Sequence, residues 1–146
     1  MIAEFRSIFE RDIEKLKTEI ESFQSEANLW VTKGAITNTS GNLCLHLVGN
    51  LKAFVGNNMG GIKYTRDRKA EFSLKDIPRA TLVQMVNETK EVVLQTFETL
   101  TSEDLEKKHP QNVLGYEMTN RFFLIHLASH LSYHLGQINY LRRMLE

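Results

Sequence analysis

The sequence predicts an all-α protein, a four-helix bundle with long connections between its helices. Apolar residues recur at steps of three and four along four long segments, which is typical of helices with one buried face. Only two prolines and eight glycines interrupt the chain, and six of those glycines lie between residues 34 and 61. No segment alternates apolar and polar residues as a half-buried strand would. We therefore expect helices, and we expect them to pack on one another.

The first helix is expected from about residue 5 to residue 23. Its apolar positions follow the helical period, and Glu and Lys fill most of the remaining ones: Phe5, Ile8, Phe9, Ile13, Leu16, Ile20 and Phe23. A second helix should begin at residues 39–42, whose small polar side chains suit an N-cap, and stop at residues 56–58. Its inner face would carry Leu43, Leu47, Leu51 and Phe54, with His46 and Asn50 at the edge.

Residues 56–77 are expected to form a loop, and the mixed charges of residues 66–71 indicate a solvated surface. Asp76 and Pro78 suit the cap and first turn of a third helix, which should end near Thr101. A polar stretch follows over residues 102–117. Thr119 is then the expected cap of a last helix that reaches almost to Glu146.

The last helix is predicted to be apolar on more than one side. Its polar strip is narrow, and five large apolar residues lie away from its histidines: Leu124, Leu127, Leu131, Leu135 and Ile138. Such a helix must bury two faces. Two explanations remain open, namely a central position in the bundle and a homodimer contact through this helix.

Composition and charge exclude several classes of protein. The 146 residues suit one domain, and 18 Lys and Arg balance 18 Asp and Glu, so nothing favours a nucleic acid as partner. No apolar run is long enough to span a membrane. The single cysteine, Cys44, cannot form an internal disulfide and suits a small buried apolar position. With no signal-like N-terminal segment, we expect a cytoplasmic protein.

Three of the five histidines lie four residues apart in the last predicted helix. At about 100° per residue, His126, His130 and His134 fall within an arc of roughly 80°, with Tyr133 and Gln137 in or beside it. Neighbours at this spacing can direct two imidazoles at one metal ion. A third ligand must come from another helix, and His46 is the best candidate. His109, beside Pro110 in a polar stretch, is expected to be exposed.

A purely structural role for these histidines is the alternative. A single histidine on an apolar helix face is usually a hydrogen-bonded residue of the core. Three on one face argue otherwise, because burying several imidazoles without partners is unfavourable. A divalent cation would satisfy them together. Cys44 does not help to decide, because it lies about 200° around the helix from His46.

Two segments resemble the DinB/YfiT-like superfamily of metalloenzymes. They are residues 41–51, GNLCLHLVGNL, and residues 130–137, HLSYHLGQ. Residues 64–68, YTRDR, with Glu71 and Phe72, are also similar to a branch of that superfamily. The resemblance spans nearly the whole chain. It implies one DinB-like four-helix bundle domain over residues 1–146, with up-down-down-up topology, often dimeric, that holds a divalent metal on three histidines.

Carried over residue by residue, the resemblance implies that His46, His130 and His134 are the metal ligands. The remaining candidates would orient the ligands or line a cavity: His126, Gln137, Asn50, Tyr133 and Arg66. In that interpretation Arg66 lies on a loop that closes over the cavity and holds an anionic substrate, and a solvated loop is the alternative. Zn or Ni are the metals most expected, and Fe, Mn or Co also accept imidazole.

Three neutral histidines would leave a coordination position open, as in catalytic sites. Relatives of this fold include thiol-dependent transferases and isomerases, so the resemblance implies a small-molecule substrate such as a low-molecular-weight thiol. No Glu lies between His130 and His134, which disfavours the zincin route of peptide hydrolysis. Tyr64 and Tyr133 are available as proton donors. The alternatives are a metal-binding bundle without turnover and a helical interaction protein whose histidines only pack.

Overall fold

Four long helices account for most of the chain in the computed structural model, which describes residues 1–146. They are α1 (Ile2–Ser22), α2 (Ser40–Leu51), α4 (Arg79–Thr99) and α6 (Asn120–Leu145). A π-helical turn, η2 (Lys52–Asn57), continues α2. Shorter elements lie in the connections: η1 (Glu26–Trp30), α3 (Arg68–Ser73) and α5 (Ser102–Glu106). The only β pairing is an isolated bridge between Lys108 and Thr119, so the all-α prediction is confirmed.

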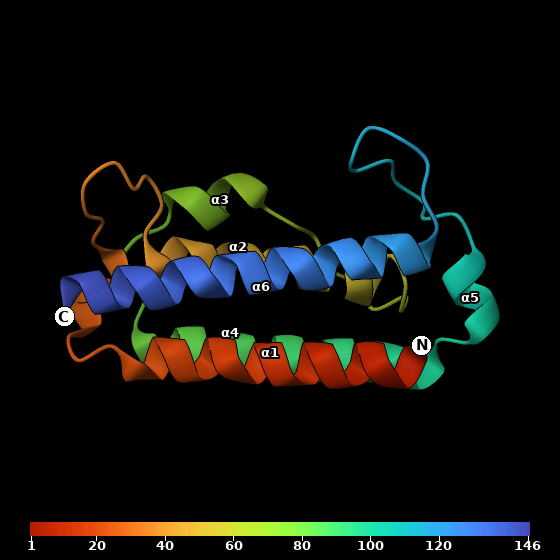
Figure 1. Cartoon of the computed structure of the whole chain (residues 1–146), viewed down its shortest axis with the longest axis horizontal. Coiled ribbons are helices and arrows are strands. Elements are labelled where there is room, and N and C mark those ends of the chain that lie inside the picture. Colours follow the sequence, from red (N-terminus) through yellow and green to blue (C-terminus); the bar gives the residue numbers. More distant parts are fainter.

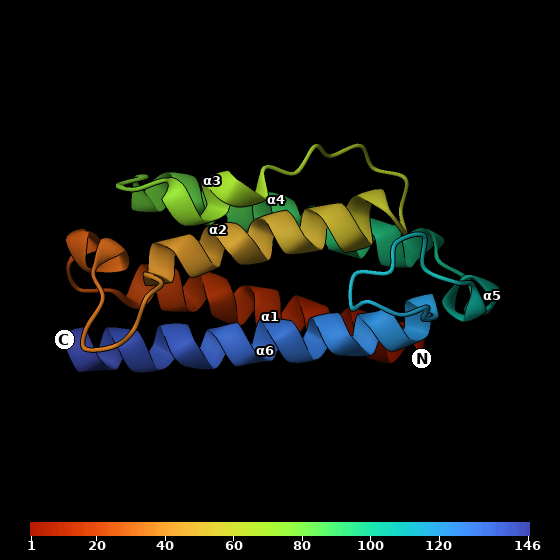
Figure 2. The ribbon, with the colours of Figure 1, turned by 90° about the horizontal axis from the view of Figure 1, so that it is seen from above.

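The four long helices run up, down, down and up along one axis. In Figures 1 and 2, α1 and α6 run in one direction, while α2 and α4 run in the other. α1 packs against both α4 and α6, and α2 packs against the same two helices. α3 lies outside this bundle, over α2 (Figure 1). The topology that the family resemblance implied is therefore the one observed.

A continuous core fills the space between these helices. It contains 28 buried apolar residues, from Phe5 on α1 to Ile138 on α6. The five large apolar residues of α6 expected to lie away from the histidines are all buried in it. Burial in the core of the bundle therefore accounts for these five apolar residues of α6. Cys44 is fully buried as expected, and burial raises the pKa of its thiol to about 12.

Threonine side chains cap two of the long helices where the sequence predicted caps. Thr39 accepts a hydrogen bond from the backbone N–H of Asn42, and Thr119 accepts one from that of Phe122. The cap predicted at Asp76 was wrong, because α4 begins at Arg79 and Pro78 occupies the N-cap position. Asp76 therefore lies too early in the chain, and the backbone N–H of Arg79 donates to the side chain of Glu26 instead.

Short helices interrupt two segments that were expected to be irregular. Asp67 caps α3 by accepting a hydrogen bond from the N–H of Ala70. Thr101 and Asp104 form a reciprocal capping box on α5. Hydrogen bonds from Lys107 and Thr101 lower the pKa of Asp104 to about 2. Both helices are too short to give a periodic apolar pattern. None of the helices in the structure has the length and apolar character needed to cross a bilayer.

Candidate metal centre

Three imidazoles converge between α2 and α6. His46 comes from α2, and His130 and His134 lie one turn apart on α6. The Nε2 atom of His130 is 3.1 Å from Nε2 of His46 and 3.1 Å from Nε2 of His134. One ligand nitrogen from each residue lies within 4.8 Å of the others. The structure thus brings together the three residues that the sequence analysis selected from distant segments.

Hydrogen bonds fix which nitrogen of His46 and His134 faces the centre. Nδ1 of His46 lies 3.0 Å from Oε1 of Glu71, and Nδ1 of His134 lies 2.7 Å from Oε1 of Gln137. Both oxygens are acceptors, so each Nδ1 donates, and the tautomer with its proton on Nδ1 directs the lone pair of Nε2 inward. A proton on Nε2 of His130 can be donated to Nε2 of His46 or to Nε2 of His134, but not to both. Its Nδ1 is buried and has no hydrogen-bond partner.

Two of the three separations between these nitrogens suit a shared divalent metal. Three nitrogens about 2.0–2.1 Å from a tetrahedral ion lie roughly 3.3 Å from one another, and a facial octahedral arrangement brings them to about 3.0 Å. The two 3.1 Å separations fall within this range. An ion would also satisfy all three inward nitrogens at once, which one imidazole proton cannot do. The residues present therefore fit the metal that the fold family implies.

Burial keeps two of these imidazoles neutral. Burial, with the charges of His134 and His46 adding to it, lowers the pKa of His130 to about 3. Burial also lowers the pKa of His134 and outweighs the opposite effect of its hydrogen bond to Gln137. Neutral imidazole is the form that binds metal. The centre is therefore ready to bind an ion at neutral pH without first losing a proton from either residue.

Glu71 is a further residue of the centre that the sequence analysis did not assign. It lies on α3, is 5% exposed, and accepts a hydrogen bond from His46. Arg66 binds both of its oxygens, with Nε 2.9 Å from Oε2 and Nη2 2.9 Å from Oε1. Burial raises the pKa of Glu71, but the hydrogen bonds from His46 and Arg66 outweigh it, so the pKa lies below its usual value. Glu71 is thus held as a carboxylate.

This pairing corrects the interpretation of residues 66–71 as a solvated surface. Asp67, Arg68 and Lys69 are exposed as expected, whereas Glu71 is buried and Arg66 is half-buried. The guanidinium of Arg66 also lies 5.4 Å from the centre of the Phe54 ring. Nε and Nη2 of Arg66 both bind the carboxylate of Glu71. Arg66 therefore holds a carboxylate of the protein itself, whereas the family resemblance suggested that it holds an anionic substrate. A helix of only six residues with a single inward carboxylate gives no periodic sequence pattern that could have revealed the burial of Glu71.

The other candidate residues lie around the three histidines in different ways. His126 is half-buried one turn before His130, and the two rings stack with centroids 6.2 Å apart. Tyr133 packs its ring against His134 but is 64% exposed. Asn50 is buried on α2, and its Oδ1 has no hydrogen-bond partner. Tyr64 is half-buried, and burial raises the pKa of its hydroxyl.

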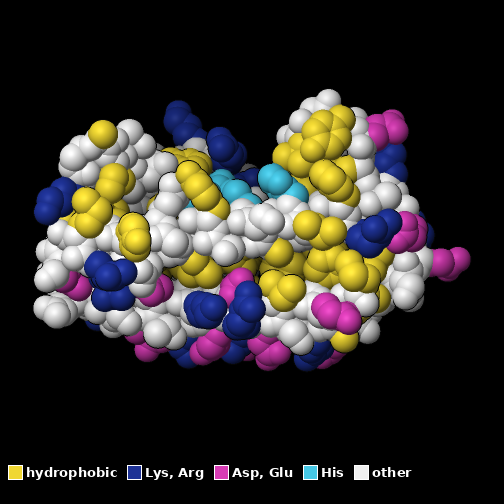
Figure 3. Space-filling model, in the orientation of Figure 1, with side chains coloured by type: hydrophobic (Ala, Val, Ile, Leu, Met, Phe, Trp, Pro, Cys, Tyr) yellow, Lys and Arg dark blue, Asp and Glu magenta, His cyan; other side chains and the backbone are white.

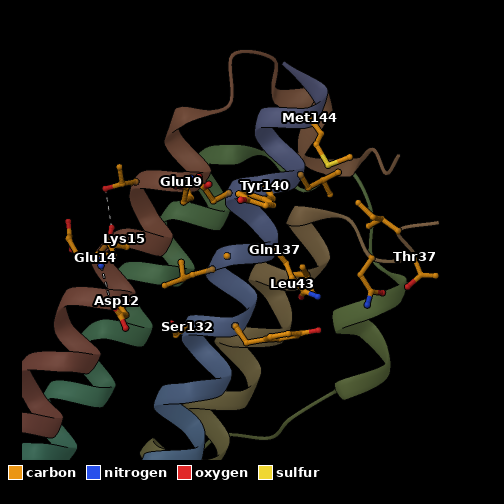
Figure 4. A pocket seen from close by; sticks show the side chains of 18 of the residues that line it. Asp12, Glu14, Lys15, Glu19, Thr37, Leu43, Ser132, Gln137, Tyr140 and Met144 are labelled. Atoms are coloured by element: carbon orange, nitrogen blue, oxygen red, sulfur yellow. Dashed lines mark hydrogen bonds and ion pairs between the residues drawn. The ribbon is translucent and has the colours of Figure 1, made fainter. Parts of the chain in front are cut away.

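The surface is hollowed above the centre. Figure 3 shows histidine side chains on the floor of a depression between two raised parts of the molecule. A second hollow, a groove of about 1220 Å³, lies between α1, α6 and residues 35–38 (Figure 4). None of the three ligand candidates lines this groove, but Gln137 and Tyr133 do. Both residues also contact the ring of His134.

His109 is buried, so its predicted exposure was wrong. Its Nδ1 is 2.9 Å from Oδ1 of Asn120, and the amide of Asn58 lies 3.3 Å from its Nε2. Its ring packs edge-on against Phe123 with centroids 4.5 Å apart. Burial lowers its pKa. The polar sequence around Pro110 gave no sign of this, because the burial arises when residues 107–120 fold back onto α6.

Comparisons with known proteins agree with the fold. A family described as "Protein of unknown function (DUF1572)" matches residues 2–146. No curated protein matches the chain. Among solved structures, the chain is similar to a DinB-like protein from Bacillus cereus ATCC 10987, with 19% sequence identity and a TM-score of 0.76. The match covers 97% of this chain and 90% of that one, and it shows that the two share the DinB-like fold.

Proposed function

The chain belongs to the DUF1572 family, and from that premise we propose that it binds one divalent metal ion through His46, His130 and His134. The observation that supports the proposal is the close approach of three imidazoles, in which Nε2 of His130 lies 3.1 Å from Nε2 of both His46 and His134 and all three ligand atoms lie within 4.8 Å of one another. Zinc and nickel are the ions best suited to three imidazoles, and iron, manganese and cobalt are also accepted.

We propose further that the protein is an enzyme acting on a small molecule. Structural zinc sites are usually closed by four protein ligands, whereas only three side chains converge here. A bound ion would supply an open position at which a thiol or water loses its proton more readily. Figure 3 shows histidine side chains in a depression of the surface, and we propose that a small molecule reaches the open position from there.

The charge of the site favours an anionic exogenous ligand. The three imidazoles add no negative charge, and Arg66 neutralises the carboxylate of Glu71. A cation in this position would keep its own charge, so it would favour an anionic partner such as a thiolate. We therefore propose transfer of a low-molecular-weight thiol to an electrophile as the reaction class, with a related metal-assisted transfer or hydrolysis as the alternative. Tyr133, whose ring packs against His134, and Tyr64, whose pKa is raised by burial and by the charge of Glu71, are the proton donors available to this reaction.

The activity is tested with zinc- or nickel-loaded protein, a thiol panel that includes glutathione and bacillithiol, and a panel of electrophiles. Consumption of one thiol with one electrophile is expected, and His134→Ala should abolish it. Ser129→Ala, which changes an exposed residue on the same helix, is the matched control. A metal-loaded protein that turns over none of these pairs would leave the alternative function, a metal-binding protein without catalysis.

We also propose that two copies of this chain associate through α6. Five large apolar residues form an outward stripe on this helix, each 48–68% exposed: Phe122, Ile125, Tyr133, Tyr140 and Met144. They share one side of the helix, roughly 100° wide, along most of its length. A stripe of this kind is self-complementary when a second copy packs across it about a twofold axis. If the protein is instead a helical interaction protein whose histidines only pack, it would bind its partner through this same stripe.

A further inference from the structure

The carboxylate of Glu71 occupies a space on α2 that only glycine leaves open. A β carbon placed on Gly49 would lie within van der Waals overlap of Glu71, 2.6 Å from its Cδ and closer still to Oε2. The other carboxylate oxygen, Oε1, is the acceptor for Nδ1 of His46, one turn earlier on the same helix. The absence of a side chain at Gly49 is thus what lets the carboxylate reach His46.

Polar contacts on both sides hold α3 in this position. The amide of Asn42, a buried residue of α2, donates to the backbone oxygens of Glu71 and Leu74 at 3.0 and 2.8 Å. Its Oδ1 accepts from Lys75 at 2.6 Å. On the other side the guanidinium fork of Arg66 fixes the rotation of the carboxylate. Such a set of contacts restricts Glu71 to one placement.

We propose that Glu71 is a positioning residue for the metal centre, and that Gly49 is the receptor for its carboxylate on α2. Glu71 holds His46 in the tautomer with the proton on Nδ1, so that Nε2 offers its lone pair toward His130 and His134. Carboxylates that accept from the far nitrogen of a histidine ligand fix its orientation and raise its basicity, and their loss weakens metal binding about tenfold to a hundredfold. The proposal rests on the metal site proposed above.

The first test needs no metal. Nitrogen-15 NMR of the metal-free protein reports which nitrogen of His46 carries the proton. The parent should show the Nδ1–H tautomer, and Glu71→Ala should raise the population of the Nε2–H form. An identical tautomer in both proteins would overturn the proposal. If the tautomer responds but the parent binds no zinc, the metal function fails while the positioning of His46 by Glu71 stands.

The second test measures zinc affinity by competition with a chromophoric chelator. Glu71→Ala should bind zinc about tenfold to a hundredfold more weakly than the parent. Glu71→Gln keeps the size of the side chain and an amide oxygen as acceptor, so it should lose less, and it serves if Glu71→Ala does not fold. Equal affinity of the parent and both variants would contradict the proposal.

The third test asks whether Gly49 acts through Glu71. Gly49→Ala should weaken zinc binding by displacing the carboxylate, whereas Gly136→Ala, where a β carbon meets nothing within 4 Å, should not. In the Glu71→Ala background, Gly49→Ala should cost no further affinity, because the atoms that it displaces are gone. Losses that simply add in the double variant would show that Gly49 acts by another route, and would overturn its assignment as the receptor.

Discussion

His134 and Gln137 form a hydrogen bond of 2.7 Å between Nδ1 and Oε1, three residues apart on α6. This bond orients the ring of His134 as the bond to Glu71 orients that of His46, because it leaves Nε2 as the inward acceptor. The two supports differ in strength, because Gln137 is neutral and exposed whereas Glu71 is charged and buried. One helix thus supplies both a ligand candidate and the residue that orients it.

Gln137→Ala should therefore weaken zinc binding by about tenfold, at the lower end of the range for such supports. The loss should be smaller than that of Glu71→Ala because an exposed neutral acceptor is easily replaced by water. Gln137→Glu is the matched variant, and its carboxylate should preserve the affinity. Competition titration of the three proteins measures the effect. Unchanged zinc affinity in Gln137→Ala would show that His134 needs no such support.

The stability of the metal-free protein should fall as the pH is lowered. His130 has a pKa of about 3 in the folded protein, and its pKa in the unfolded chain is about 6.5. A depressed folded-state pKa contributes stability that is complete above about pH 6.5 and is lost progressively as the pH falls toward about 3. Urea unfolding at about pH 7 and pH 4 measures this loss. His130→Gln should lose less stability than the parent over the same interval, and equal losses would contradict the assignment.

His109 should be important for stability and not for metal binding. His109→Ala removes a buried ring packed on Phe123 and leaves Oδ1 of Asn120 without its hydrogen-bond partner. Together these changes should lower the free energy of unfolding by about 3 kcal/mol. Metal content measured in the folded protein should match that of the parent. A loss of metal without a loss of stability would mean that His109 belongs to the centre.

The outward stripe of α6 predicts that the protein is a dimer. Light scattering coupled to gel filtration should give twice the chain mass of 16.9 kDa. Tyr140→Glu places a charge on a side chain that is 68% exposed, so it should break the dimer without unfolding the chain. Lys69→Glu, at an exposed position of α3, is the control for added negative charge. A parent that elutes with the monomer mass would contradict the association.

The sequence was sufficient to predict the long helices and the clustering of His46, His130 and His134. Periodic apolar residues identify long helices, and the four-residue spacing of His130 and His134 places both imidazoles on one face whatever the surroundings. Pairing them with His46 needed only the inward face of the second helix and the family resemblance. These features are local or periodic, which is why they could be seen before the fold was known.

Two buried polar residues could not be predicted in the same way. Glu71 lies in a run of mixed charges, and its burial depends on the empty space at Gly49, more than twenty residues earlier in the chain. His109 lies in a polar stretch, and its partners, Asn58 and Asn120, come from distant parts of the sequence. In both cases the partner residues come together only when the chain folds, so the spacing of residues in the sequence does not predict the contact.

The proposed function depends on a metal ion held by His46, His130 and His134. Elemental analysis by mass spectrometry, on tag-free protein purified without chelator, measures that metal in the parent and in His130→Ala. We expect near-stoichiometric divalent metal in the parent and its loss in the variant. No metal in the parent, even after reconstitution with zinc or nickel, would contradict the proposed site and leave the three histidines as packing residues.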